Sequence, residues 1–285
     1  MSAAALGGLP RTVLRLHRRA LLAWTAFVAG LIGWLVWLNE VTADDVRRVE
    51  GSCARHGMCA DALASLDYSK PTDWIASLIC YSFLAVAAFA GGALIGRELE
   101  SGTAQLAWTQ GVTPTRWLTA KLALPALAIT AGGAALVPAY RWGWAANRDL
   151  MGDDWTFAGV FVARGPLMVA YGLCALAFGA LAALLLRRAL AALGTAFAAM
   201  WPLHLVLERY RADLWPTVTR TSPKRPVLPA DAWPVNWGRN ADGYFAVYHP
   251  ESHYWPLHLV ETGIVLTLAA AATTAAYTVL RRRTA

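Results

Sequence analysis

The stretch that decides the fold is residues 96–121, which read GRELESGTAQLAWTQGVTPTRWLTAK. It lies between two runs that carry no charged side chain, Trp74–Ile95 and Leu122–Tyr140, and each run is long enough to cross a bilayer. A chain that leaves a membrane usually turns round in a short loop, whereas this connector places charged residues beside Leu and Trp. That composition predicts a short amphipathic helix at the membrane surface.

Two local signals indicate that the connector is structured. Ser101-Gly102-Thr103 predicts a break, because Gly is unfavourable inside a helix and Thr103 can cap the helix that follows. Thr113-Pro114 predicts the start of another helix, with Thr113 as the N-cap and Pro114 at the first helical position.

The rest of the chain is strongly apolar. Hydrophobic residues make up 57% of the 285, charged residues 15%, and the mean hydropathy is +0.41. A soluble all-α protein with buried helices is the alternative, but six apolar segments of about 20 residues disfavour it. We therefore predict an all-α integral membrane protein with one transmembrane domain over 1–285. The expected spans are about 21–38, 74–95, 116–140, 165–186, 189–207 and 257–280.

Basic residues near the span ends predict the orientation. The N-terminal tail, the 96–121 connector, the Arg187-Arg188 turn and the tail Arg281–Arg283 are short and basic, while nearly all acidic residues lie in the opposite connections. Basic residues close to spans stay in the cytoplasm. We expect a multi-pass protein of the cell membrane with both termini and the connector in the cytoplasm. The formal net charge of +7 then reflects orientation, and no nucleic-acid-binding module is apparent.

The long outward segment, 208–256, predicts an extracellular cap between the fifth and sixth spans. Its prolines rule out one continuous helix, and its aromatic residues rule out a merely solvated linker. His249 and His253 could be ligands of a metal ion. Pro250 disfavours an ordinary helix that would present both imidazole rings to one metal. We favour a role without metal.

Three further features suggest sites. Cys53 and Cys59 lie close together in the first outward loop, so a disulfide is a candidate there. Glu261 falls inside the last span, where an acid is costly unless it is paired or hydrated. Arg164, at the outer start of the fourth span, is either its partner or a headgroup anchor. Glu261 has either a functional role or a structural one, and we favour the structural one, a hydrogen bond within the bundle to a neighbouring span or to the cap.

Motifs for chemistry are missing from the sequence. It contains no Gly-x-x-x-x-Gly-Lys-Ser/Thr phosphate loop, no His-Glu-x-x-His and no Gly-x-Ser-x-Gly. We therefore expect no catalytic residues, no cofactor and no metal on this chain.

The whole pattern resembles the permease subunit of an ABC transporter of the ABC-2 (type V exporter) class, and is closest to permeases common in actinomycetes. The six-span layout extends the resemblance over almost the whole chain. The residues that carry it are Arg97–Lys121, Arg187-Arg188 before the fifth span, and Tyr248-His249-Pro250 before Tyr254-Trp255 and Glu261.

The resemblance implies that the connector 96–115 holds a coupling helix that docks on a separate ATPase subunit, which would bind ATP and Mg. By resemblance, the contact would be formed by Arg97, Glu98, Glu100, Gly102 and Thr103. We expect Glu98 and Glu100 to face the ATPase and to contribute little to the packing of the spans.

The expected function is that of a permease, not an enzyme, which pairs with a second permease copy or a sister permease. With the ATPase it would export a hydrophobic or amphipathic substrate. A transporter without a nucleotide site must receive mechanical work through a cytoplasmic element, and the connector is long enough for that. The alternatives are a membrane-anchored accessory or sensor subunit without a transport path and, third, a membrane-embedded enzyme.

Overall fold

Six long helices dominate the structure. The computed structural model describes residues 17–56, 65–152, 154–240 and 243–284, with the backbone alone for 52–56. Six of the described helices are long and apolar enough to cross a membrane, which confirms the predicted all-α integral membrane fold. Their helical cores are α2 (Arg18–Trp37), α4 (Leu66–Phe89), α7 (Pro114–Ala146), α9 (Leu167–Leu186), α10 (Ala189–Arg209) and α11 (Tyr254–Thr284).

Shorter elements join or extend these helices. Two π-helical segments, η1 (Leu38–Thr42) and η2 (Ala90–Gly96), continue α2 into α3 (Ala43–His56) and α4 into α5 (Arg97–Glu100). The other short elements are α6 (Thr103–Thr109), η3 (Arg148–Leu150), α8 (Ala158–Ala163), η4 (Arg211–Leu214), η5 (Glu251–His253), and the strands β1 (Val218–Ser222), β2 (Trp233–Asn240) and β3 (Gly243–His249).

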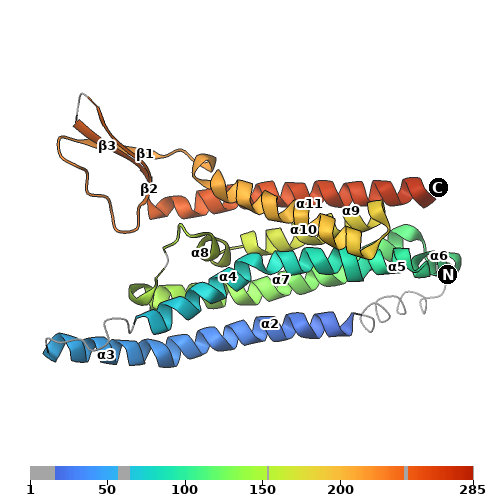
Figure 1. Cartoon of the computed structure of the whole chain (residues 1–285), viewed down its shortest axis with the longest axis horizontal. Coiled ribbons are helices and arrows are strands. Elements are labelled where there is room, and N and C mark those ends of the chain that lie inside the picture. Colours follow the sequence, from blue (N-terminus) through green and yellow to red (C-terminus); the bar gives the residue numbers. More distant parts are fainter. Residues whose placement is uncertain (1–16, 57–64, 153, 241–242, 285) are drawn as a thin grey trace.

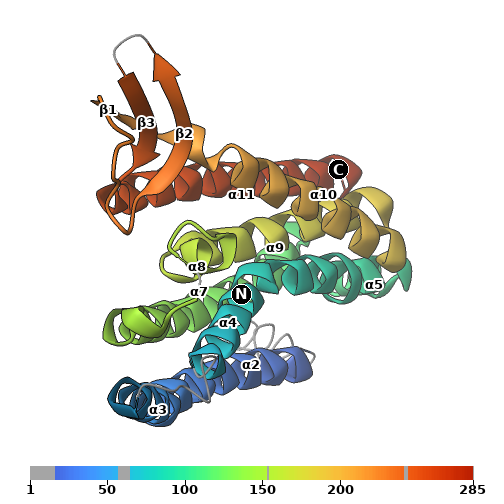
Figure 2. The ribbon, with the colours of Figure 1, turned by 60° about the vertical axis from the view of Figure 1, so that its left-hand side comes forward.

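The long helices run side by side along the length of the molecule (Figure 1). The short helices α5 and α6 lie at one end of the bundle, and α11 ends there too, while the strands lie at the opposite end. Figure 2 shows α2 and α3 on one flank and α11 on the other, with α9 between them. The connector and the outward segment are therefore at opposite ends, as the predicted topology requires.

The centre of the bundle is α9, whose described side chains are buried on nearly every face. Small residues allow this packing. A Cβ atom at Gly179 of α9 would lie 2.8 Å from the backbone nitrogen of Gly91, and one at Gly91 would lie 2.8 Å from the carbonyl oxygen of Ala192. Such close backbone contacts are typical of membrane helices, which associate through van der Waals packing.

The helices extend beyond the predicted spans. The span expected at 74–95 belongs to a helical stretch over Leu66–Glu100, and the one expected at 116–140 belongs to α7. Hydropathy marks the part of a helix that lies in hydrocarbon, whereas hydrogen bonding continues into the polar turns on either side. The start of α7 is as predicted: the Thr113 hydroxyl accepts a hydrogen bond from the backbone nitrogen of Arg116 (3.4 Å), and Pro114 occupies the first turn.

The outward segment contains a three-stranded antiparallel sheet in the order β1-β3-β2, which the sequence analysis did not predict. The central strand β3 pairs Ala246 with Arg220 of β1 and with Trp237 of β2. A shift of register falls between Pro234 and Asn236, next to a residue that has no N–H to donate to the ladder. The sheet adds a small β element to a fold that is otherwise helical.

Candidate functional site

The connector consists of two short helices separated by a bend. The bend is at Gly102, whose backbone φ of 76° lies in the left-handed region that favours glycine. The predicted break is therefore present, but Thr103 is the first residue of α6 and not its cap. The Thr103 hydroxyl donates instead to the carbonyl oxygen of Glu98 (3.3 Å), which holds α6 against α5.

Glu98 binds the start of α7. One carboxylate oxygen forms an ion pair with the Lys121 ammonium group, and the other accepts a hydrogen bond from the Trp117 indole nitrogen (3.1 Å). The Lys121 side chain is only 3% exposed and that of Glu98 is 18% exposed. Lys121 also lies 3.0 Å from the ring nitrogen Nε2 of His17, just before α2. Burial and the charge of Lys121 lower the pKa of His17, although Glu98 opposes them.

Glu100 binds the start of α10. Its carboxylate accepts a hydrogen bond from the backbone nitrogen of Ala189 (2.9 Å), the first residue of that helix. A negative charge at a helix N-terminus is favourable because the first backbone N–H groups there lack partners within the helix. The two glutamates of α5 therefore tie the connector to α7 and to α10.

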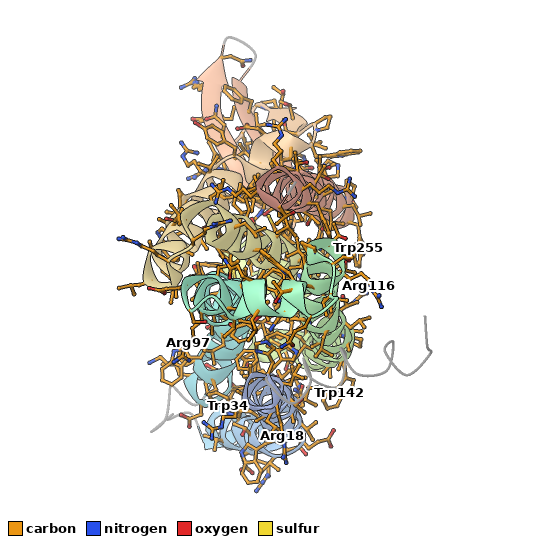
Figure 3. All side chains as sticks on the ribbon, turned by 90° about the vertical axis from the view of Figure 1, so that its right-hand side faces the viewer. Arg18, Trp34, Arg97, Arg116, Trp142 and Trp255 are labelled. Carbon is orange, nitrogen blue, oxygen red and sulfur yellow. The ribbon has the colours of Figure 1, made fainter. Side chains whose placement is uncertain are left out.

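Several residues of the connector are exposed. Arg97 and Thr103 are exposed, and the Leu106 side chain is 58% exposed although it is apolar. Figure 3 views the molecule from this end and shows Arg97 and Arg116 on opposite sides of the bundle.

A second charged site lies near the other end of the bundle. The Arg211 guanidinium donates to both carboxylate oxygens of Glu261, at 2.7 and 3.2 Å, and the Tyr171 hydroxyl donates to one of them at 2.9 Å. The side chains of Arg211 and Glu261 are 1% and 0% exposed. This pair joins η4, at the start of the outward segment, to α9 and α11.

Arg164 is not the partner of Glu261. Its guanidinium lies 3.8 Å from Glu251 and stacks over the rings of Trp144 and Tyr254, at 4.6 and 4.5 Å from their centroids. Arg164 comes at the end of α8, whereas Glu261 lies further along α11 and faces Arg211, so this interpretation of Arg164 was wrong. Glu251 also pairs with Arg148 (2.7 Å), which in turn binds Asp231 (2.5 Å).

The two histidines of the outward segment contact each other. Their Nδ1 atoms are 3.0 Å apart, and the Nε2 atom of His249 donates to the carbonyl oxygen of Ala212 (2.9 Å). Among the described residues no group of three or more His, Cys, Asp or Glu side chains could hold a metal. The candidate disulfide lies outside the described residues, because neither the side chain of Cys53 nor any part of Cys59 is described.

Comparison with known families identifies the family of the chain. The family model described as "ABC-2 membrane transporter related" matches residues 25–211, which is more than half of the chain. The chain belongs to this family. The match runs from α2 to Arg211 and includes the whole connector. No curated protein and no solved structure matches the chain.

Membership of the ABC-2 family makes the protein a multi-pass membrane subunit of an ABC transporter, a transport protein that is not itself catalytic. The structure then corrects one expectation about the connector. Glu98 and Glu100 do not project away from the bundle, because their carboxylates bind Lys121, Trp117 and the backbone of Ala189. Glu98 is largely buried and contributes to the packing, whereas Glu100 binds Ala189 and remains exposed.

Sequence reasoning missed the partners of both charged sites. Trp117 and Lys121 are four residues apart and so lie on one face of α7, a spacing that could have marked them as a pair facing the bundle. Arg211 carried no local signal of burial. Only its position just after the fifth span indicated that the Arg211 side chain could turn toward the bundle and reach Glu261.

Proposed function

We propose that this ABC-2 subunit is the permease of an ATP-driven exporter and that α5 and α6 dock on a separate ATPase subunit, which binds ATP and Mg. One observation carries the proposal. The connector is fixed to the bundle on its inner face through Glu98 and Glu100 and exposes Arg97, Thr103 and Leu106 on its outer face.

The inner contacts supply a mechanical link. A force on α6 acts on α5 through the bond between Thr103 and Glu98, and α5 is held to α7 and α10 by its two glutamates. Because α4, η2 and α5 form a continuous helical stretch, the same force also reaches α4. A movement of the ATPase would therefore reach three membrane helices at once.

The outer face has the chemistry of a docking surface. Leu106 is an exposed apolar side chain, which suits insertion into a groove on the partner. Arg97 adds a charge at the rim, where complementary charges steer association. Gly102 and Thr103 lie between them at the bend.

The remaining parts of the proposal follow from the resemblance and from the charge pattern. Both termini and the connector lie in the cytoplasm, the permease pairs with a second copy or a sister permease, and the substrate is hydrophobic or amphipathic. We further propose that the protein acts in the cell membrane and is of the type common in actinomycetes. A membrane-anchored accessory subunit without a transport path is the alternative.

The test is co-purification of an ATPase from native membranes with the full-length chain. Leu106→Glu places a charge in the docking surface and should abolish the association, while the amount of membrane-inserted chain stays the same. Val227→Glu is the matched control, because Val227 is an exposed apolar residue (83%) in the outward segment. Equal ATPase recovery with both variants would rule out docking at α6. Recovery of no ATPase with the wild-type chain would favour the accessory role.

A further inference from the structure

A large apolar groove opens between α2, α4 and α7. It has a volume of about 850 Å³, within the range of about 300–1,000 Å³ typical of pockets for small molecules. We call it the lateral groove. Side chains from all three helices line it, among them Leu21, Phe27, Leu78, Val86, Leu124 and Ile129.

Polar contacts join the helices at the inner end of the groove and beyond its outer end. Beyond the outer end, the Asn39 side chain of η1 accepts hydrogen bonds from the Tyr68 hydroxyl of α4 (3.1 Å) and from the amide of Asn147 (2.5 Å), the residue after α7. At the inner end, Lys121 of α7 binds His17, next to α2, and Glu98, beyond α4. Between these ends α2 packs along α7 and stands away from α4. The space is part of the fold and needs no movement of the helices to form.

The lining of the groove is mostly apolar, and two of its polar side chains already have partners. The Trp24 indole nitrogen donates to the carbonyl oxygen of Ala128 (2.8 Å), and the Ser82 hydroxyl donates to that of Ile79 (2.9 Å). A buried water needs two to four polar partners, so a space lined in this way does not hold water well. In a membrane, hydrocarbon is the material that fills it.

The dimensions suit one extended hydrocarbon chain. The lining residues of α4 run from Trp74 to Phe89, which at 1.5 Å per residue is about 22 Å. One leaflet supplies about half of the ~30 Å hydrocarbon thickness, so a lipid chain that starts at the cytoplasmic end of the groove fits within its length. Because the groove is a side opening between α2 and α4, such a chain can enter from the bilayer.

The inner mouth is basic. His17 lines the groove, and the next two residues, Arg18 and Arg19, are exposed in the first turn of α2. In Figure 1, α2 begins toward the end of the bundle where α5 and α6 lie, and Figure 3 shows Arg18 on the lower flank formed by α2. Basic side chains at the membrane surface attract anionic lipids.

We propose that the lateral groove binds one acyl chain of an anionic membrane phospholipid, whose phosphate lies beside Arg18 and Arg19. The lipid acts as a structural ligand that fills the gap between α2 and α4. This inference does not depend on the proposed docking of an ATPase, because it concerns the isolated chain in a bilayer.

The test uses the full-length chain in lipid nanodiscs with phosphatidylglycerol that carries a photoreactive diazirine in one acyl chain. After illumination, mass spectrometry should find the adducts concentrated on groove residues such as Leu78 and Leu124. Ala85→Trp and, from the opposite wall, Ala23→Trp fill the groove and should each lower this labelling about tenfold or more, since contact with several methylene groups is lost.

The matched control is Ala271→Trp, an equal increase in size at an exposed position of α11, which should leave labelling of the groove unchanged. Adducts spread evenly over the exposed faces of α10 and α11 in the wild-type chain would overturn the proposal. Cross-links from the groove to a second copy of the chain, in place of lipid adducts, would also overturn it.

A second arm tests the headgroup. Arg18→Glu combined with Arg19→Glu should lower groove labelling by the phosphatidylglycerol probe several-fold and leave labelling by the corresponding phosphatidylcholine probe unchanged. Equal labelling of the wild-type groove by the two probes would overturn the assignment of an anionic lipid.

Discussion

Glu98 and Glu261 are both paired with cations, near opposite ends of the same bundle, and their surroundings differ. Glu98 binds Lys121 close to the surface, and the Glu98 side chain is 18% exposed. Glu261 binds Arg211 with both side chains at 1% exposure or less, and it accepts a further bond from Tyr171. Both pairs join segments that are far apart in sequence.

The difference shows how burial changes what a charge pair does. When one partner of a fully buried pair is removed, the other charge is left without water or a counter-ion, and this is strongly destabilising. A partly exposed pair can recruit water in place of the lost partner. The Glu261–Arg211 pair is therefore expected to contribute more to the stability of the fold than the Glu98–Lys121 pair, which joins a partly exposed connector to the bundle.

The largest effect is expected from Glu261→Gln. The change leaves the Arg211 guanidinium buried without an opposite charge, which should lower the free energy of unfolding by about 3–5 kcal/mol. The free energy of unfolding is measured by unfolding the detergent-solubilised chain with increasing concentrations of dodecyl sulfate.

The double variant Glu261→Gln with Arg211→Gln serves as the control, because it removes both charges and should recover a large part of the loss. Tyr171→Phe removes one hydrogen bond and should cost only about 0.5–1.5 kcal/mol. If the double variant is no more stable than Glu261→Gln, the charge pair is not the reason for the loss.

A smaller loss is expected from Glu98→Gln. Lys121 loses its counter-ion and Trp117 keeps a weaker acceptor, so we expect a loss of about 1–3 kcal/mol and a shift of tryptophan fluorescence. Glu100→Gln is the matched control, because its amide oxygen still accepts from the backbone of Ala189 and its side chain is exposed. Equal losses in the two variants would show that Lys121 does not need Glu98.

The pH dependence of the outward segment comes next. Burial lowers the pKa of His249 below its ordinary value of 6.5, and the neighbouring His253 lowers it further, although the bond to Ala212 opposes both. A histidine with a lowered pKa takes up its proton first in the unfolded state, so its contribution to stability is full above about pH 6.5 and falls as the pH drops below that value. Fluorescence of Trp233, whose ring centroid is 5.6 Å from that of His249, should report the loosening.

The control for this prediction is His249→Asn, which should remove the acid-dependent step. His253→Asn keeps the bond between His249 and Ala212 and should retain a step. An unchanged step in His249→Asn would assign the titration to another group.

The smallest effect on the fold is expected from Leu106→Glu. The side chain is 58% exposed, so the free energy of unfolding should change by no more than about 0.5 kcal/mol. The same variant is expected to lose ATPase association entirely. A large loss of stability would mean that Leu106 packs on the bundle and is not part of a docking surface.

Much of the fold could be read from the sequence because it depends on local properties. Apolar runs fix the membrane helices, and Thr113-Pro114 marks the start of α7 through one side-chain bond and one fixed φ angle. The sheet also had a local signal that was not used. Tyr244–Tyr248 is rich in aromatic and β-branched residues, and it directly follows the Asp242-Gly243 pair that is typical of hairpins.

The sequence by itself determined that the chain is a helical membrane protein and where its charged connector lies, because hydrophobicity and turn chemistry act over a few residues. Only the tertiary structure decided which charges meet. Glu98 pairs with a residue 23 positions away and Glu261 with one 50 positions away. Such pairs depend on how each helix is rotated and on which helices are neighbours, and both are set by packing over the whole bundle, where small residues such as Gly91 and Gly179 let the helices approach.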